Sequence, residues 1–71
     1  DLIYMTYKDS SPIYGIAAYA NSKEDGTYTI VASIHDITAD EQALLELVQQ
    51  CNRLELSTIH LNDVIEDFLA I

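Results

Sequence analysis

The apolar residues of this chain change their spacing once, near residue 38, and that change limits the folds open to it. Residues 2–7, 13–20 and 27–37 are rich in β-branched and aromatic side chains, which predicts three strands. Apolar residues then recur at i, i+3, i+4 and i+7, which predicts helices over about 39–54 and 58–69. The order β-β-β-α-α predicts an α+β fold, a small three-stranded antiparallel sheet followed by two helices packed on one face.

The length of 71 residues allows a single domain, residues 1–71, with a small core. A chain this short buries only about 60% of its unfolded surface. Its one cysteine, Cys51, cannot form an internal disulfide and suits a reducing compartment. No basic segment leads into an apolar signal sequence, and no apolar run approaches the roughly 18 residues of a membrane helix. We therefore expect a cytoplasmic protein that does not bind membranes.

The turns and faces of the predicted sheet can also be assigned. Asp25 and Gly26 predict a hairpin between the second and third strands, because glycine accepts positive φ. Gly15 inside the second strand indicates a β-bulge or the close approach of another backbone. Strict alternation along the third strand predicts one buried and one wetter face. The buried set would be Tyr28, Ile30, Ala32 and Ile34, and the wetter set Thr29, Val31, Ser33 and His35.

The start of the first helix is predicted by Thr38 and Glu41, which have the spacing of a capping box. The apolar stripe that follows is Leu44, Leu47, Val48, Cys51 and Leu54. Leu45 points about 100° away from this stripe, so we expect it to be exposed and available to a partner. Ser57 or Thr58 is expected to cap the second helix.

The formal net charge is −9, with 12 acidic side chains against the basic Lys8, Lys23 and Arg53. Direct binding to nucleic acid requires Lys and Arg to displace counterions from phosphates, so that class is disfavoured. An anionic membrane surface is disfavoured for the same reason. A protein partner with a basic surface is compatible with this charge, as is a charge that only maintains solubility.

The closing segment HLNDVIEDFLAI, residues 60–71, holds acids without a local explanation. Asp63, Glu66 and Asp67 lie opposite the apolar side of the second helix, and no Lys or Arg stands three or four positions away. Glu66 and Asp67 also approach the negative end of the helix, which costs up to ~1 kcal/mol each. Two interpretations stay open, a solvated face and, together with His60, a docking face for a basic partner.

The candidate catalytic and metal-binding side chains are few. They are His35, Asp36, Cys51, His60, Asp63 and Asp67. His60 and Asp63 stand three positions apart and Asp67 follows one turn later, so they are weak candidates for a metal site. Cys51 lies on the apolar stripe, where a buried structural thiol is expected. No HExxH, CxxC, GxGxxG or P-loop sequence is present.

The small size also leaves little room for a ligand pocket of about 300 Å³. We therefore predict no catalytic residues, no bound cofactor or metal, and no enzyme activity.

Five tyrosines fall in the predicted strands. Tyr14 and Tyr28 fit the buried face, Tyr19 fits the opposite face, and Tyr4 or Tyr7 must join it because the core is small. Tyrosine packs in cores, yet exposed tyrosine is also favoured at interfaces. A three-stranded sheet has open edges that a partner strand could occupy. With an exposed Leu45, the pattern is compatible with a homodimer formed through a sheet edge or the helices.

Four segments carry a resemblance to a known family. They are YGI at 14–16, DIT at 36–38, CNRLELS at 51–57 and HLNDVIEDFL at 60–69. In this order they resemble a family of short soluble proteins from Firmicutes, common in gut clostridia, whose function is unknown. The resemblance covers residues 13–69. It implies a bacterial, cytoplasmic protein with a compact α+β domain, and it supplies no catalytic residues. It also places Asp36, His60, Asp63, Glu66 and Asp67 inside recurring motifs.

These observations predict a small acidic protein-interaction module without catalysis. Its expected surface combines His60, Asp63, Glu66 and Asp67 with Tyr19 and Leu45. One alternative is an inhibitor that imitates nucleic acid, of the kind phages use against CRISPR or restriction systems, because acids on a rigid face can occupy an Arg-rich groove. Another is a regulator that senses a metal or ligand through His60, Asp63 and Asp67.

Overall fold

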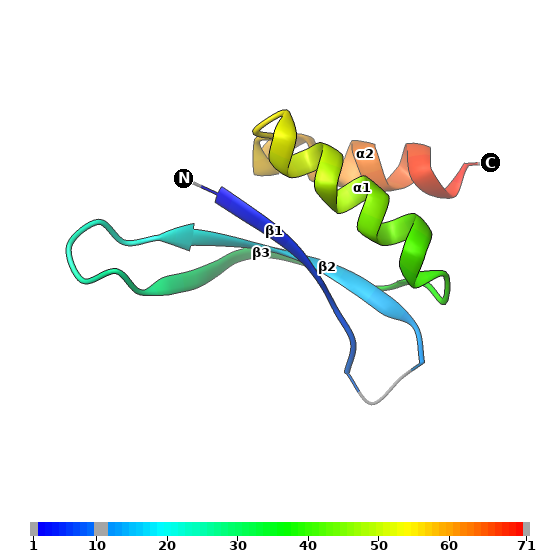
Figure 1. Ribbon diagram of the computed structural model, residues 1–71. Helices are drawn as coiled ribbons and strands as arrows, with labels where there is room; N and C mark the ends of the chain where they lie inside the picture. Colours follow the sequence, from blue (N-terminus) through cyan, green and yellow to red (C-terminus); the bar gives the residue numbers. More distant parts are fainter. Residues whose placement is uncertain (1, 10–11, 71) are drawn as a thin grey trace.

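The computed structural model describes residues 2–9 and 12–70, and Figure 1 shows a sheet with both helices on one side of it. Within those residues three antiparallel strands precede two α-helices, so the α+β prediction is confirmed. The elements are β1 (Leu2–Tyr7), β2 (Tyr14–Asn21), β3 (Tyr28–Thr38), α1 (Glu41–Arg53), the 3-10 turn η1 (Thr58–His60) and α2 (Leu61–Leu69).

The strands lie in the order β1-β2-β3, each antiparallel to the next. The chain turns between β2 and β3 at Gly26, whose φ of 74° lies in the left-handed region. The Asp25 carboxylate accepts hydrogen bonds from the Thr27 backbone N–H at 3.1 Å and from its hydroxyl at 2.8 Å. These bonds lower the pKa of Asp25. The predicted Asp25-Gly26 hairpin is confirmed.

The core lies between the sheet and the helices. The buried side chains are Tyr4, Ile16, Ala18 and Ile37 from the strands, and Leu44, Val48, Cys51, Leu61 and Ile65 from the helices. The Tyr4 hydroxyl donates to the backbone oxygen of Leu56 at 2.7 Å, so this ring is both buried and hydrogen-bonded. Cys51 is a buried free thiol, as its place on the apolar stripe predicts. In the described part of the chain, no buried side-chain N or O atom lacks a partner.

Helix α1 does not begin with the predicted capping box. Strand β3 continues to Thr38, which pairs with Tyr14, and the N-cap is Asp40. The Asp40 carboxylate accepts from the Ala43 N–H at 3.1 Å, while the Thr38 hydroxyl accepts from the Asp40 N–H at 3.1 Å. The predicted capping box formed by Thr38 and Glu41 is therefore wrong. Asp caps a helix as well as Thr does, and strand pairing holds Thr38 in the sheet.

Two leucines of α1 and its C-terminal end, Leu45 and Leu54, also differ from the prediction in their exposure. Helix α1 ends at Arg53, so Leu54 leaves the stripe and is 68% exposed, and Leu56 is the residue that packs half-buried against the core. Leu45 is half-buried and not exposed. A helix lying on a sheet covers an apolar face wider than a single stripe, which explains the position of Leu45.

Strand β3 does not alternate strictly. Ala18 pairs with Ala32 but Tyr19 pairs with Ile30, so β3 has one extra residue, Val31, at this point. This β-bulge reverses the direction of every side chain on the hairpin side of it. Ala32 and Ile34 pack toward the helices as predicted, whereas Tyr28 and Ile30 lie on the other face, contrary to prediction.

Candidate interaction surface

The sheet face turned away from the helices carries apolar and aromatic side chains. We call it the open sheet face. It consists of Ile3, Met5, Tyr7, Ala17, Tyr19, Tyr28, Ile30, Ser33 and His35, with Asp9 at its rim. No described helix or strand covers it (Figure 1). Met5, Tyr28 and Ile30 are 52%, 52% and 56% exposed. Large apolar side chains normally stay exposed as scattered single residues, so their gathering here marks this face as a candidate site.

The strand register builds this face in cross-strand rows. Side chains directly opposite one another on neighbouring strands lie about 5 Å apart, close enough to contact. The first row is Ile3, Tyr19 and Ile30, and the second is Met5, Ala17 and Ser33. Tyr28, opposite Asn21, extends the face toward the hairpin. The rows form one continuous patch that spans β1, β2 and β3.

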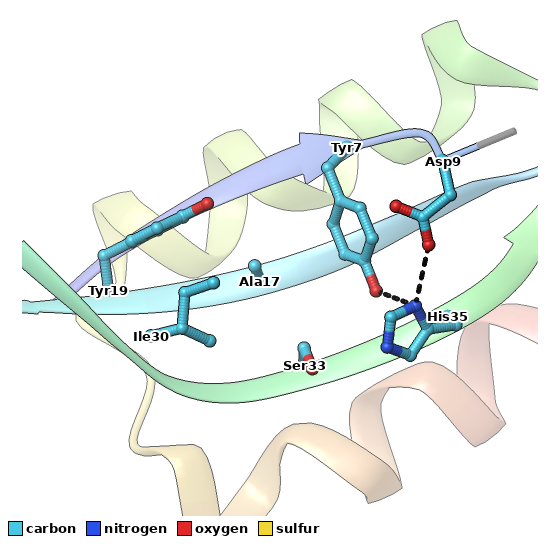
Figure 2. A pocket seen from close by; sticks show the side chains of 7 residues that line it. All are labelled: Tyr7, Asp9, Ala17, Tyr19, Ile30, Ser33 and His35. Carbon is cyan, nitrogen blue, oxygen red and sulfur yellow. Dashed lines mark hydrogen bonds and ion pairs between the residues drawn. The ribbon is translucent and has the colours of Figure 1, made fainter.

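Two hollows are set into this patch, one on each side of Tyr19. The larger has a volume of about 430 Å³ and is lined by Ile3, Met5, Tyr19 and Tyr28. The smaller has a volume of about 240 Å³ and lies among Tyr7, Asp9, Ala17, Tyr19, Ile30, Ser33 and His35 (Figure 2). The expectation that the chain has little room for a pocket is therefore wrong. The space exists because one sheet face is left uncovered.

Gly15 shapes the end of the open sheet face that lies near Tyr7. A Cβ at this position would lie 2.5 Å from the Ile34 backbone oxygen and 3.1 Å from both the Cα of His35 and Cε1 of Tyr7. The register of β2 and β3 also shifts here, between Tyr14 and Ile16. Both readings of Gly15, a bulge and a close approach, are confirmed. Without a side chain on Gly15, the Tyr7 ring can cross β2 and reach His35 on β3.

Tyr7, His35 and Asp9 form the polar end of the face. The Tyr7 hydroxyl and Nδ1 of His35 share a hydrogen bond of 2.5 Å, and Asp9 Oδ2 lies 3.4 Å from the same nitrogen (Figure 2). The two rings meet edge to face with centroids 5.2 Å apart. Desolvation and the nearby Asp9 carboxylate raise the pKa of Tyr7. Sequence spacing gives no sign of this cluster, because Tyr7 and His35 stand 28 residues apart.

The cluster resembles a Ser-His-Asp set in composition but not in arrangement. In such a triad the carboxylate holds one ring nitrogen and the serine hydroxyl bonds the other. Here Asp9 and Tyr7 both lie at Nδ1 of His35, and Ser33 lines the same hollow. His35 and Asp9 are also largely exposed. The arrangement fixes the orientation of His35 but does not align it with a nucleophile.

The structure separates the residues that the sequence places in one surface. Tyr19 lies on the open sheet face, as predicted. His60, Asp63, Glu66 and Asp67 are exposed on η1 and α2, in the helical layer behind the sheet. Leu45 lies half-buried on α1 in that layer too. Tyr19 and the acids of α2 therefore lie on opposite sides of the domain (Figure 1) and do not form one continuous surface.

The proposed metal ligands do not form a cluster. Within residues 2–9 and 12–70, no three His, Cys, Asp or Glu side chains lie close enough together to hold a metal ion. His60 is the N-cap residue of α2, and its side chain makes no capping hydrogen bond. Asp63 lies in the first turn of α2, where the helix dipole favours a negative charge.

The sheet edges are each protected. On β1, Asn52 of α1 accepts from the Tyr4 N–H at 2.7 Å and donates to the Tyr4 oxygen at 3.0 Å, which occupies the edge as a neighbouring strand would. On β3, two register shifts and the positive φ of 55° at Asp36 break the regular edge. Bulges of this kind turn an edge away from pairing with another strand.

Comparison with known proteins gives one match. Residues 1–71 match the sequence model of DUF6514, a family of unknown function. No curated protein and no solved structure matches the chain. Among the described helices, none has the length and apolar character that crossing a membrane requires.

Proposed function

For this chain, which belongs to the DUF6514 family of unknown function, we propose a role in protein binding. We propose that it is an interaction module that binds its partner through the open sheet face. The observation that carries the proposal is the continuous apolar and aromatic patch around Tyr19. Antiparallel sheets with one solvated face normally alternate apolar and polar residues. Here Ile3, Met5 and Ile30 occupy positions that a solvated face would give to polar side chains.

Protein binding fits the patch better than catalysis does. The larger hollow is lined by Ile3, Met5, Tyr19 and Tyr28, which offer apolar surface and phenol hydroxyls but no acid-base pair. In the polar cluster at the other end, the Tyr7 hydroxyl and the Asp9 carboxylate both lie at Nδ1 of His35, which is not the arrangement of a catalytic triad. Exposed tyrosine and methionine are the side chains that protein interfaces favour. The proposed role is binding, with no chemical step and no cofactor.

The proposed setting is the cytoplasm of a bacterium of the Firmicutes. The unpaired, buried thiol of Cys51 suits a reducing compartment. The recurring motifs at 14–16 and 60–69 support the bacterial source.

A second candidate surface is the acidic side of α2, used against a basic partner or as an imitation of nucleic acid. Asp63, Glu66 and Asp67 are all exposed, and the single ion pair in the described part of the chain joins His35 and Asp9 instead. Binding of this kind would weaken steeply with salt, whereas binding through the open sheet face would not. Among the residues that the structure describes, no cluster of ligands supports the metal-sensing alternative.

The test is site-specific photocrosslinking in cells that naturally contain the protein. A photoreactive phenylalanine derivative replaces Tyr28 on the open sheet face or, as the control, the exposed Gln49 on α1. The proposal expects a discrete adduct from position 28 and none from position 49. Excess unlabelled protein should suppress the adduct, and its Ile30→Lys variant should not. Absence of an adduct at position 28, or the same adducts at both positions, would overturn the proposal.

A further inference from the structure

We infer that the partner of the open sheet face is a second copy of this chain, so that two sheets stack face to face and the helices lie on the outside. The inference rests on the proposed function and specifies its partner. It draws on the charge distribution, the exposed area and the state of the sheet edges.

The charge distribution sets the open sheet face apart from the rest of the molecule. The chain carries a formal net charge of −9. On the open sheet face the charged groups are Asp9 at the rim and, when protonated, His35, and these two already lie 3.4 Å apart. A strongly basic partner would find no matching acids in the middle of this face. An uncharged apolar surface matches it, and the same face on a second copy is such a surface.

Stacking two copies by this face keeps the acids of the helices apart, although Asp9 at the rim of the face and the hairpin acids Glu24 and Asp25 lie in the sheet layer. The acids of α1 and α2 lie in the helical layer, behind the sheet. Stacked sheets lie about 10 Å apart, and each helix adds about 10 Å on the outside. The two acidic layers would therefore be separated by well over the Debye length of ~8 Å at physiological ionic strength. Repulsion between the two helical layers is screened, although each copy is highly charged.

The chain exposes more surface than its mass predicts, and both the open sheet face and the projecting β2–β3 hairpin (Figure 1) contribute to the excess. The accessible surface is 4921 Å². A compact monomer of 8.0 kDa is expected to expose about 4,450 Å², roughly 470 Å² less. A stable dimer buries about 800 Å² on each copy. The open sheet face spans roughly 25 Å along the strands and 14 Å across them, so it supplies about half of that as a flat footprint. An interface of this size belongs with weak, transient associations, and its area alone does not set a dissociation constant.

The shape of the face suits a two-fold interface, in which each projection needs a recess on the same surface. The hollows on either side of Tyr19 are the recesses, and Tyr28 and Ile30, each more than half exposed, line them and offer the side chains that a second copy could contact. The alternative of pairing through a sheet edge is less favourable. Asn52 already occupies the edge of β1, and the bulges of β3 interrupt the other.

The test is sedimentation equilibrium of the purified chain from about 1 µM to 1 mM, a range that brackets micromolar affinity. Wild type should change from 8.0 kDa to twice that mass. Ile30→Lys on the open sheet face should weaken association by about tenfold or more, because it buries an unpaired charge. Leu54→Lys is the matched control: this leucine is 68% exposed but lies off the face. Both variants lower the net negative charge, so loss of the dimer in Ile30→Lys alone cannot result from repulsion.

The inference fails if wild type stays at the monomer mass throughout, or if Ile30→Lys associates as tightly as Leu54→Lys. Should circular dichroism show that Ile30→Lys is unfolded, Met5→Lys, also on the face, replaces it under the same criteria. Raising NaCl to about 1 M should leave the dimer intact or tighten it, whereas a dimer that dissociates would indicate ionic contacts and overturn the inference. A monomeric wild type with a position-28 adduct to another protein refutes the second copy but keeps the proposed function. No adduct refutes both.

Discussion

The two faces of the sheet are built from the same three strands, and both are apolar, yet the helices cover only one of them. On the covered face Tyr4, Ile16 and Ala18 are almost fully buried. On the open sheet face Met5 and Ile30 keep more than half of their surface exposed. Both faces have the composition of a core, but only one has become a core within this chain. This difference is the reason we propose that another molecule covers the open sheet face.

The largest expected contrast between the two faces comes from removing one large aliphatic side chain from each. Leu44→Ala, at a fully buried position under the sheet, should lower the free energy of unfolding by about 2–5 kcal/mol. Ile30→Ala removes a side chain of similar size from the open sheet face and should change it by no more than about 0.5 kcal/mol in the monomer.

Urea unfolding followed by circular dichroism measures both changes in the free energy of unfolding. The protein concentration should be well below the micromolar range, so that the chain is monomeric. Repeating it near 1 mM should raise the cost of Ile30→Ala if a second copy covers the face, because dimerisation stabilises the folded state by mass action. Equal costs for Leu44→Ala and Ile30→Ala at low concentration would show that the two faces do not differ as described.

The two glycines allow a second, smaller contrast. Gly15→Ala forces a Cβ to within 2.5 Å of a backbone oxygen that cannot move without displacing β3, so it should cost about 2–3 kcal/mol. Gly26→Ala meets no atom within 4 Å and is penalised only by its φ of +74°, about 1 kcal/mol.

Gly15→Ala should also displace the Tyr7 ring from His35, which nuclear magnetic resonance can detect as shifted His35 ring signals. Gly26→Ala, in the distant hairpin, serves as the control and should leave these signals unchanged. An undisturbed Tyr7–His35 contact in Gly15→Ala would contradict the role assigned to Gly15.

Local chemistry made the fold predictable. The order of elements, the Asp25-Gly26 turn and the buried Cys51 follow from spacing and from the preferences of single residues, and the structure agrees. The start of α1 was not predictable in detail. Thr38 and Asp40 are both good caps, and the choice between them depends on pairing with Tyr14 more than 20 residues away.

The open sheet face was less predictable, because it depends on a single irregularity. The extra residue Val31 in β3 moves Tyr28 and Ile30 from the predicted buried side to the open side. Nothing in the local sequence marks the bulge, since Val31 is an ordinary strand residue. The sequence places Tyr19 correctly because the extra residue lies in β3, so β2 keeps its alternation through Ala18 and Tyr19. The Tyr7–His35 contact needs the register of all three strands and was therefore out of reach.

A third contrast concerns the edge of β1, which helix α1 protects. Asn52→Ala removes both hydrogen bonds to the backbone of Tyr4 and should cost about 1–2 kcal/mol. Gln49→Ala, an exposed position on the same helix, should cost less than about 0.5 kcal/mol. Urea unfolding measures the difference, and light scattering should show increased aggregation for Asn52→Ala because the edge is freed. Equal stability and equal scattering would show that the edge needs no protection.

The smallest expected effect is a loss of stability at alkaline pH that originates on the covered face. Burial raises the pKa of the Tyr4 hydroxyl above its ordinary 10.0 and that of the Cys51 thiol above its ordinary 9.0. Both groups are neutral when protonated. Above these ordinary values the unfolded chain has released protons that the folded chain still holds, so the free energy of unfolding falls as pH rises. Below about pH 8, neither group titrates and neither contributes a slope.

Two variants separate the contributions of these groups. Cys51→Ala should flatten the part of the decline that begins near pH 9, and Tyr4→Phe the part that begins near pH 10. The slopes are compared, and not the absolute stabilities, because each variant also loses packing or a hydrogen bond. The measurement is urea unfolding between about pH 7 and 11. If neither slope changes, the alkaline decline comes from elsewhere, with Tyr7 at the polar end of the open sheet face as the next group to test, since its pKa is raised as well. In that case the pH dependence of stability would originate on the open sheet face and not on the covered face.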